Sequence, residues 1–175
     1  MHQPGEKWMY HTGSDVLGVL IARASGQPFE TFLRERIFEP LGMKDTAFSV
    51  PASKLDRLAT AYGTNFKTGA LELYDPAEGG QWSRPPVFPS GGGGLVSTVE
   101  DYLAFSHMLL NAGRHDSGRI LSRPAVETMT TDQTTLAQKA VSGLILGYFD
   151  SHGWGFGVAV VTRREDTAAP VGSDG

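Results

Sequence analysis

The strongest constraint on the fold is an alternation of bulky and small residues in the C-terminal part of the chain. The bulky positions are Trp154, Phe156, Val158 and Val160. Glycine or alanine fills the positions between them, so residues 153–160 predict a strand with one bulky face and one nearly bare face. We expect a helix or a second backbone to pack closely on the bare side.

A strand of this kind requires partners, because an isolated strand is at best marginally stable in water. The residues after Val161 offer no convincing second strand. We therefore expect an incomplete antiparallel sheet that is completed by sequence before Met1 or beyond Gly175, in a chain that is cut at both ends.

Most of the remaining sequence predicts helices and turns. With 22 glycines and 10 prolines, the chain contains too many turn residues for a simple helical bundle. Apolar residues at helical spacing predict helices at residues 14–25, 28–39 and 99–112, and shorter ones at 123–129 and 136–141. The fold class is therefore mixed α/β (α+β), with a mostly helical portion and one C-terminal strand.

Several residues are expected to begin or end these helices. Ser14 is the predicted N-cap of the first helix, and Gly26 ends it. Pro40 is expected to end the second helix, and Leu41-Gly42-Met43 to form an apolar plug under a turn.

The third helix is predicted to begin with a capping box formed by Ser97 and Glu100, and to end at Gly113. Because bulky apolar residues widen its stripe, we expect this helix to be buried on more than one side and to be central to the core.

Residues 49–90 show little periodicity and contain many prolines and glycines. They predict a long irregular excursion that contains one hairpin. Long loops in compact domains are often functional, so this segment is a candidate wall of a binding cleft, with a surface insertion as the alternative.

Charge and composition exclude several classes of partner and site. The formal charge is −4 with no long basic run, which argues against nucleic acid, and no apolar run is long enough to cross a bilayer. The absence of cysteine excludes thiol chemistry but leaves the redox compartment open. The five histidines show no metal-ligand spacing, so we predict neither a metal site nor a cofactor.

A series of motifs carries a resemblance to a known family. Pro4-Gly5 precedes Tyr10-His11-Thr12 and a helix, and further matches follow in family order. These are Ser25-Gly26, Phe38-x-Pro40-Leu41-Gly42-Met43, Gly91–Gly94 with Leu95-Val96-Ser97-Thr98 and Asp101, Leu109-Leu110-Asn111, and Gly153-Trp154-Gly155-Phe156-Gly157. Together they resemble the class C β-lactamase and family VIII esterase group of serine hydrolases, which has a penicillin-binding-protein-like fold.

The resemblance implies roles for residues near the first motif. Tyr10 would be the catalytic tyrosine that moves protons to and from a nucleophilic serine. Thr12 stands where many β-lactamases have asparagine, and it lacks the amide that would hold a β-lactam side chain, which favours the esterase branch. Gly91, Gly92 and Gly93, with Thr12, are the candidate substrate-binding residues.

Two other patterns suggest sites that we do not adopt. Lys67-Thr68-Gly69 spells a penicillin-binding-protein motif but lies in the irregular excursion, so we expect a solvated turn. The run Gly91–Gly94 lacks the lysine and the preceding strand of a phosphate loop. We expect it to provide close backbone packing near the cleft.

The chain contains no Ser-x-x-Lys and no Gly-x-Ser-x-Gly. In the family, Ser-x-x-Lys precedes the tyrosine motif, so we expect residues 1–175 to be a partial domain that is inactive alone. The longer protein would hydrolyse a small ester, amide or β-lactam through an acyl-enzyme. The alternative is a non-catalytic module that binds a ligand or a protein.

Overall fold

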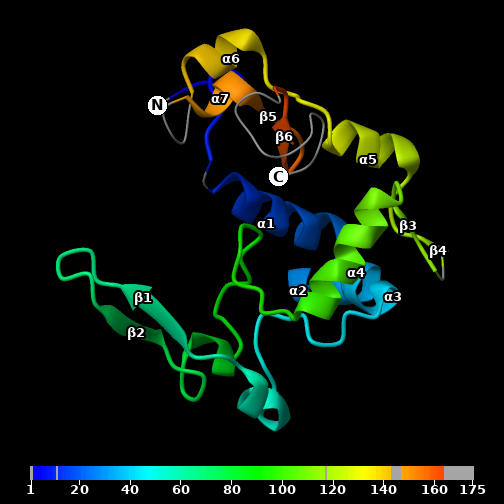
Figure 1. Cartoon of the computed structure of the whole chain (residues 1–175). Coiled ribbons are helices and arrows are strands. Elements are labelled where there is room, and N and C mark those ends of the chain that lie inside the picture. Colours follow the sequence, from blue (N-terminus) through cyan, green and yellow to red (C-terminus); the bar gives the residue numbers. More distant parts are fainter. Residues whose placement is uncertain (1, 11, 117, 143–146, 164–175) are drawn as a thin grey trace. The chain divides into compact units, whose positions relative to one another are not determined.

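The computed structural model describes residues 2–10, 12–116, 118–142 and 147–163 (Figure 1). They form two compact units. The tyrosine unit, named for Tyr10, consists of the described parts of residues 1–11 and 108–175. The α1 unit consists of residues 12–107 and is named for its first helix, α1 (Gly13–Ser25). Both units combine short helices with two-stranded antiparallel sheets, which confirms the mixed fold class.

Helix α1 (Gly13–Ser25) opens the α1 unit. It ends at Gly26, whose φ of 69° is the left-handed conformation that glycine adopts without strain, as predicted. The prediction of Ser14 as N-cap is wrong. The carbonyl of Thr12 already accepts a hydrogen bond from Val16 N at 3.1 Å, so Thr12 is the N-cap and Ser14 lies inside the helix.

The second predicted helix is a continuous helical run of three elements. These are α2 (Phe29–Leu33), the π-helical η1 (Arg34–Phe38) and α3 (Glu39–Leu41). The prediction that Pro40 ends the helix is wrong. The hydrogen bonds change to the π-helical pattern at η1, before Pro40. Pro40 lies in the first turn of α3, where its missing N–H is tolerated. The run ends at Gly42, and Met43 is buried as the predicted apolar plug.

The irregular excursion contains η2 (Ala52–Arg57), η3 (Gln81–Ser83) and the hairpin of β1 (Ala61–Thr64) with β2 (Leu71–Asp75). The expected hairpin is thus confirmed. Lys67-Thr68-Gly69 lies at its turn, where the N–H groups of Lys67 and Thr68 donate to Asn65 Oδ1 at 2.9 and 3.2 Å. These residues are exposed, so the predicted solvated turn is confirmed.

Helix α4 (Val99–Leu110) departs from the prediction in two ways. Thr98, not Ser97, caps it, because Thr98 Oγ1 accepts from Asp101 N at 3.2 Å. The expected burial on more than one side is also wrong, since Val99 is 80% exposed and Leu110 is 81% exposed. The described residues cover only one side of the helix, the side that carries Asp101 and Met108.

The tyrosine unit contains three short helices and a small sheet before its last hairpin. They are β3 (Arg114–His115) paired with β4 (Gly118–Arg119), α5 (Arg123–Met129), α6 (Leu136–Ala140) and α7 (Tyr148–Ser151). The two short predicted helices are thus confirmed as α5 and α6. Ser122 Oγ caps α5 by accepting from Ala125 N at 3.2 Å, and Thr135 with Gln138 forms a capping box at α6.

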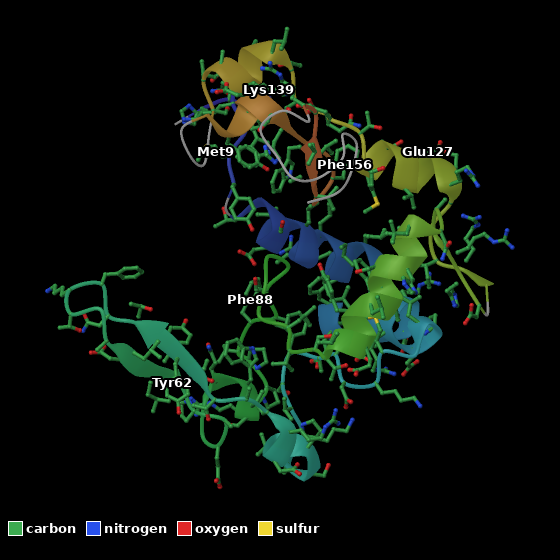
Figure 2. All side chains as sticks on the ribbon, viewed as in Figure 1. Met9, Tyr62, Phe88, Glu127, Lys139 and Phe156 are labelled. Atoms are coloured by element: carbon green, nitrogen blue, oxygen red, sulfur yellow. The ribbon has the colours of Figure 1, made fainter. Side chains whose placement is uncertain are left out.

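The single strand predicted for residues 153–160 is wrong. The chain forms β5 (His152–Trp154) and β6 (Ala159–Val161), which pair antiparallel with Gly153 opposite Val160. Glycines allow the turn between them, and Gly157 has a φ of 86°. Phe156 lies exposed at this turn (Figure 2).

The close approach expected on the bare side of this segment is confirmed. A Cβ added to Gly155 would lie 1.8 Å from the carbonyl oxygen of Met129, at the end of α5. The hairpin therefore takes its partner strand from within the segment and packs its glycines on the chain after α5.

Each unit has its own buried apolar residues. Phe38, Met43 and Phe48 are buried in the α1 unit, and Val126, Val160 and Val161 in the tyrosine unit. Among the helices that the structure describes, none has the length and apolar character needed to cross a bilayer.

Candidate active site

Tyr10 presents an exposed phenol held from one side by aromatic rings. Tyr10 is 56% exposed. The Trp154 ring meets it edge-on with centroids 5.7 Å apart, and the Trp8 ring is tilted at 6.2 Å. The phenol hydroxyl makes no hydrogen bond within the described residues, which leaves it accessible to a partner.

Trp8 lies at the centre of what we call the aromatic cluster, formed by Trp8, Tyr10, Tyr148, Phe149 and Trp154. The Trp8 ring lies 4.9 Å from Trp154, 5.3 Å from Phe149 and 6.5 Å from Tyr148, measured between centroids. Tyr148 is partly buried, and burial raises the pKa of its phenol, whereas Tyr10 is the exposed phenol of the cluster.

The backbone of Trp154 is held on both sides by the loop before α6. Its N–H donates to Asp132 Oδ1 at 3.1 Å, and its carbonyl accepts from Gln133 N at 2.8 Å. Burial opposes ionisation of Asp132, but hydrogen bonds from Lys139 and Thr134 outweigh it and lower the pKa of the carboxyl to about 2. The loop therefore carries a fixed negative charge beside the strand that supplies Trp154.

Thr12 stands at the N-terminus of α1 in the α1 unit. Its backbone has helical angles, with φ −69° and ψ −1°, and its side chain makes no capping hydrogen bond. The residue is exposed. Its hydroxyl is therefore not required for capping the helix.

The glycine run packs on the first turns of α1, and the expected close packing is confirmed for Gly91. A Cβ at Gly91 would lie 2.1 Å from the carbonyl oxygen of Ser14. Gly92 N donates to Asp15 Oδ1 at 3.3 Å and to Ser90 Oγ at 3.0 Å. Gly93 has no atom within 4 Å of an added Cβ, so the run is tight at its first residue and open at its third.

The structure thus brings Gly91 and Gly92 onto the helix that Thr12 begins, all within the α1 unit. Tyr10 belongs to the tyrosine unit. Sequence reasoning missed the aromatic partners of Tyr10 and the Asp132 loop. The available signals were the glycines around Trp154 and the short Asp132-x-Thr134 spacing, which is typical of a side chain that bonds its own backbone.

The irregular excursion lines a cavity of the α1 unit, with a volume of about 470 Å³. Asp45 lies at this cavity between Lys54, with which it forms an ion pair, and Arg57 at 3.0 Å. Hydrogen bonds from Lys54 and Arg57 lower the pKa of the Asp45 carboxyl. The segment thus lines a cavity, but that a substrate binds there stays a prediction.

A serine–histidine pair occurs in the tyrosine unit but does not have the form of a nucleophilic site. Ser151 Oγ lies 2.9 Å from Nδ1 of the adjacent His152. Ser151 is buried at 7% exposure, and the His152 ring stacks on Tyr148 at 5.0 Å. A buried hydroxyl offers no approach to a carbonyl substrate, so we assign this pair to packing.

Comparison with known proteins identifies the class. A sequence model of the Beta-lactamase family matches residues 1–171. The chain is 39% identical over 162 residues to Protein Rv1367c of Mycobacterium tuberculosis, covering 93% of this chain and 40% of that protein. It is 27% identical over 180 residues to Esterase EstB of Burkholderia gladioli, covering 95% of this chain and 42% of that protein.

Among solved structures, EstCE1, a hydrolase with promiscuous acyltransferase activity, superposes with a TM-score of 0.76 at 23% identity. The match covers 98% of this chain and 45% of that one. The chain belongs to the Beta-lactamase family and has the fold of its esterase-like serine hydrolases. It spans less than half the length of these relatives.

Proposed function

We propose that residues 1–175 form a partial domain of a serine hydrolase that cleaves a small ester or amide through an acyl-enzyme. The observation that carries this proposal is the exposed Tyr10 phenol, held by the aromatic cluster in a chain of the Beta-lactamase family. Proteins that share one fold can act on many different substrates, so the proposed reaction must be argued from the residues of the site and not from the fold.

The chemistry requires a base beside the nucleophile. A serine hydroxyl is a weak nucleophile until its proton is removed, and a phenol with an ordinary pKa of about 10 removes it efficiently only when cations favour its ionised form. We propose that Tyr10 moves this proton and that other sequence of the protein supplies the serine, its lysine and the oxyanion-hole donors, since Ser-x-x-Lys is absent from these 175 residues.

We further propose that Thr12 and the glycine run contact the substrate. The exposed Thr12 hydroxyl can donate one hydrogen bond, and Gly93 leaves open space where a side chain would stand. Gly92 is oriented by Asp15, and Gly91 anchors the run to α1. Because Thr12 lacks the asparagine amide, and EstB is an esterase, we favour an ester substrate.

Substitution of Tyr10 tests the proposal in the longer protein that contains this chain. We expect Tyr10→Phe to lower kcat for a p-nitrophenyl ester by about 10²- to 10⁴-fold, the usual contribution of a general acid–base group. The matched control is Tyr62→Phe, because Tyr62 is also exposed, at 64%, but lies on the β1 hairpin (Figure 2). Equal activity of the two variants would contradict the role of Tyr10.

A non-catalytic binding module is the second candidate, and the absence of Ser-x-x-Lys favours it. The two candidates differ in the longer protein: an enzyme forms a covalent adduct with a fluorophosphonate probe at a serine beside a lysine, whereas a binding module does not. We expect the 175 residues alone to show negligible p-nitrophenyl ester hydrolysis. Detectable turnover by them would contradict the assignment of the nucleophile to other sequence.

A further inference from the structure

We infer that Asp132 is a positioning residue for the reaction, which holds Trp154 in place and, through the Trp154 ring, orients Tyr10. This inference rests on the proposed role of Tyr10. All the residues that carry it lie in the tyrosine unit, and the argument follows the contacts outward from the carboxylate.

Both oxygens of the Asp132 carboxylate are occupied. Oδ1 accepts from Trp154 N at 3.1 Å and from Thr134 N at 3.0 Å, and the Thr134 hydroxyl also donates to it. Oδ2 forms an ion pair with Lys139, whose side chain is 15% exposed against 22% for Asp132. Four donors on one mostly buried carboxylate join the loop, helix α6 and strand β5.

Gly153 gives the carboxylate its place over the strand. A Cβ added there would lie 2.1 Å from Asp132 Cγ and 2.4–2.5 Å from its two oxygens. Side chains cannot approach so closely, so only glycine permits the carboxylate to reach the N–H of the next residue, Trp154. The absence of a side chain at Gly153 is therefore what allows the hydrogen bond between Asp132 and Trp154 N.

The arrangement reaches Tyr10 by ring contacts. Trp154 packs edge-on to Tyr10, with centroids 5.7 Å apart, and lies 4.9 Å from Trp8. Lys139 Nζ, the partner of Asp132, also lies 6.0 Å from the centre of the Phe149 ring, which contacts Trp8. The ion pair therefore supports the aromatic cluster at two points.

Tyr10 has no hydrogen bond of its own within the described residues, so ring packing is what fixes its direction. A catalytic group displaced by about 1 Å can lose on the order of 10²-fold in rate. Release of Trp154 would permit such a displacement without removing any group that touches the substrate. We therefore expect loss of Asp132 to lower kcat and to leave KM nearly unchanged.

The test uses Asp132→Ala in the longer protein that contains this chain, with Glu127→Gln as control. Glu127 is an exposed carboxylate on α5 in the same unit, and its nearest cation, Arg123, is 4.0 Å away (Figure 2). Active sites are counted by the burst of p-nitrophenol, so kcat refers to folded enzyme only. We expect kcat per site to fall about 10- to 100-fold with KM within about threefold, and the control to match wild type.

A second variant keeps the carboxylate but displaces it. Gly153→Ala inserts the Cβ that meets Asp132, so it should lower kcat per site in the same way, and the two changes together should cost no more than the larger one. If Asp132→Ala does not fold, Gly153→Ala alone decides. Unchanged kcat per site in the folded variant would show that Asp132 is only a structural clamp and would overturn the inference.

Near-ultraviolet circular dichroism separates failure of this inference from failure of the proposed function. The signal reports the packing of aromatic rings and needs no activity. If Tyr10→Phe keeps full activity, the proposed function fails, and Asp132→Ala must still change the aromatic signal if Asp132 holds Trp154. If Tyr10→Phe is inactive but Asp132→Ala has normal kcat and an unchanged signal, only the inference about Asp132 fails.

Discussion

The two units use carboxylates to fasten loops, but the fastened parts differ. In the tyrosine unit, Asp132 holds the strand that carries Trp154, and the contacts continue through rings to the exposed Tyr10. In the α1 unit, Asp101 Oδ2 accepts from Asp45 N and from the Thr46 hydroxyl, both at 2.8 Å, and thereby joins α4 to the chain after α3.

Because of this difference, substitutions in the two units should affect different properties, stability in one and catalytic rate in the other. Contacts in the tyrosine unit converge on a side chain proposed to act in catalysis, whereas those around Asp101 and Gly91 fasten backbone groups and the Thr46 hydroxyl. Substitutions at Asp101 and Gly91 should therefore reduce stability first, and the free energy of unfolding is their natural measure. Substitutions around Asp132 should also affect the rate per folded site.

The largest loss of stability is expected from Gly91→Ala in the α1 unit. The new Cβ would lie 2.1 Å from Ser14 O and 2.9 Å from its carbonyl carbon, both backbone atoms of α1 that cannot rotate away. We expect the free energy of unfolding to fall by about 3 kcal/mol, the upper part of the range for overpacking. Urea unfolding followed by far-ultraviolet circular dichroism measures it.

Gly93→Ala is the matched control, two residues along the same run. No atom lies within 4 Å of its added Cβ, and its φ is not in the left-handed region, so we expect a change within about 0.5 kcal/mol. Equal losses at Gly91 and Gly93 would mean that general stiffening of the run, and not the contact with α1, sets the cost.

A smaller loss is expected from Asp101→Ala. Asp101 is 8% exposed, and its removal leaves Asp45 N and the Thr46 hydroxyl without their shared acceptor. Hydrogen bonds to a charged group predict a loss of about 2 kcal/mol. Glu100→Gln, the exposed neighbour on α4, should change the free energy of unfolding by less than about 0.5 kcal/mol. Similar values for the two would remove the special role of Asp101.

The next effect depends on pH and concerns Asp132. Its folded pKa of about 2 lies below the value of about 3.9 expected for an unfolded chain, so its stabilisation is full above pH 4 and is lost as the pH falls towards 2. Partial solvent exposure reduces the linkage energy to about 1 kcal/mol. The difference in unfolding free energy between wild type and Asp132→Asn should shrink by that amount from pH 5 to pH 2.

The sequence predicted most elements of both units but not their exact ends. Helical spacing and the glycines at 26 and 113 correctly located α1 and α4, because local rules govern those features. The capping of α4 by Thr98 could not be chosen from the sequence, since Ser97 and Thr98 are both good caps. Ser97 instead shares a hydrogen bond of 2.8 Å with Thr46, 51 residues away.

The candidate site likewise depends on contacts between residues that are far apart in the sequence. Motif resemblance singled out Tyr10, but nothing near it in the sequence indicates its ring partner Trp154, which is supplied by a hairpin 144 positions later (154 − 10). The alternation at residues 153–160 predicts one strand, but the same period-2 spacing also fits the two short strands joined by a turn that the structure contains. Gly157, with its left-handed φ, is the residue that decides between them.

The smallest effect on stability is expected from Thr12→Ala, and it bears on function. The Thr12 side chain makes no capping hydrogen bond at the start of α1, whereas Ser122 Oγ accepts from Ala125 N at 3.2 Å at the start of α5. Ser122→Ala should therefore cost about 1 kcal/mol and Thr12→Ala less than about 0.5 kcal/mol. Because Thr12→Ala should leave the fold intact, a rise in KM for an ester in the proposed longer hydrolase would reflect lost substrate contact. A stability loss equal to that of Ser122→Ala would instead show that the Thr12 hydroxyl caps α1, and it would remove the basis for the proposed binding role of that hydroxyl.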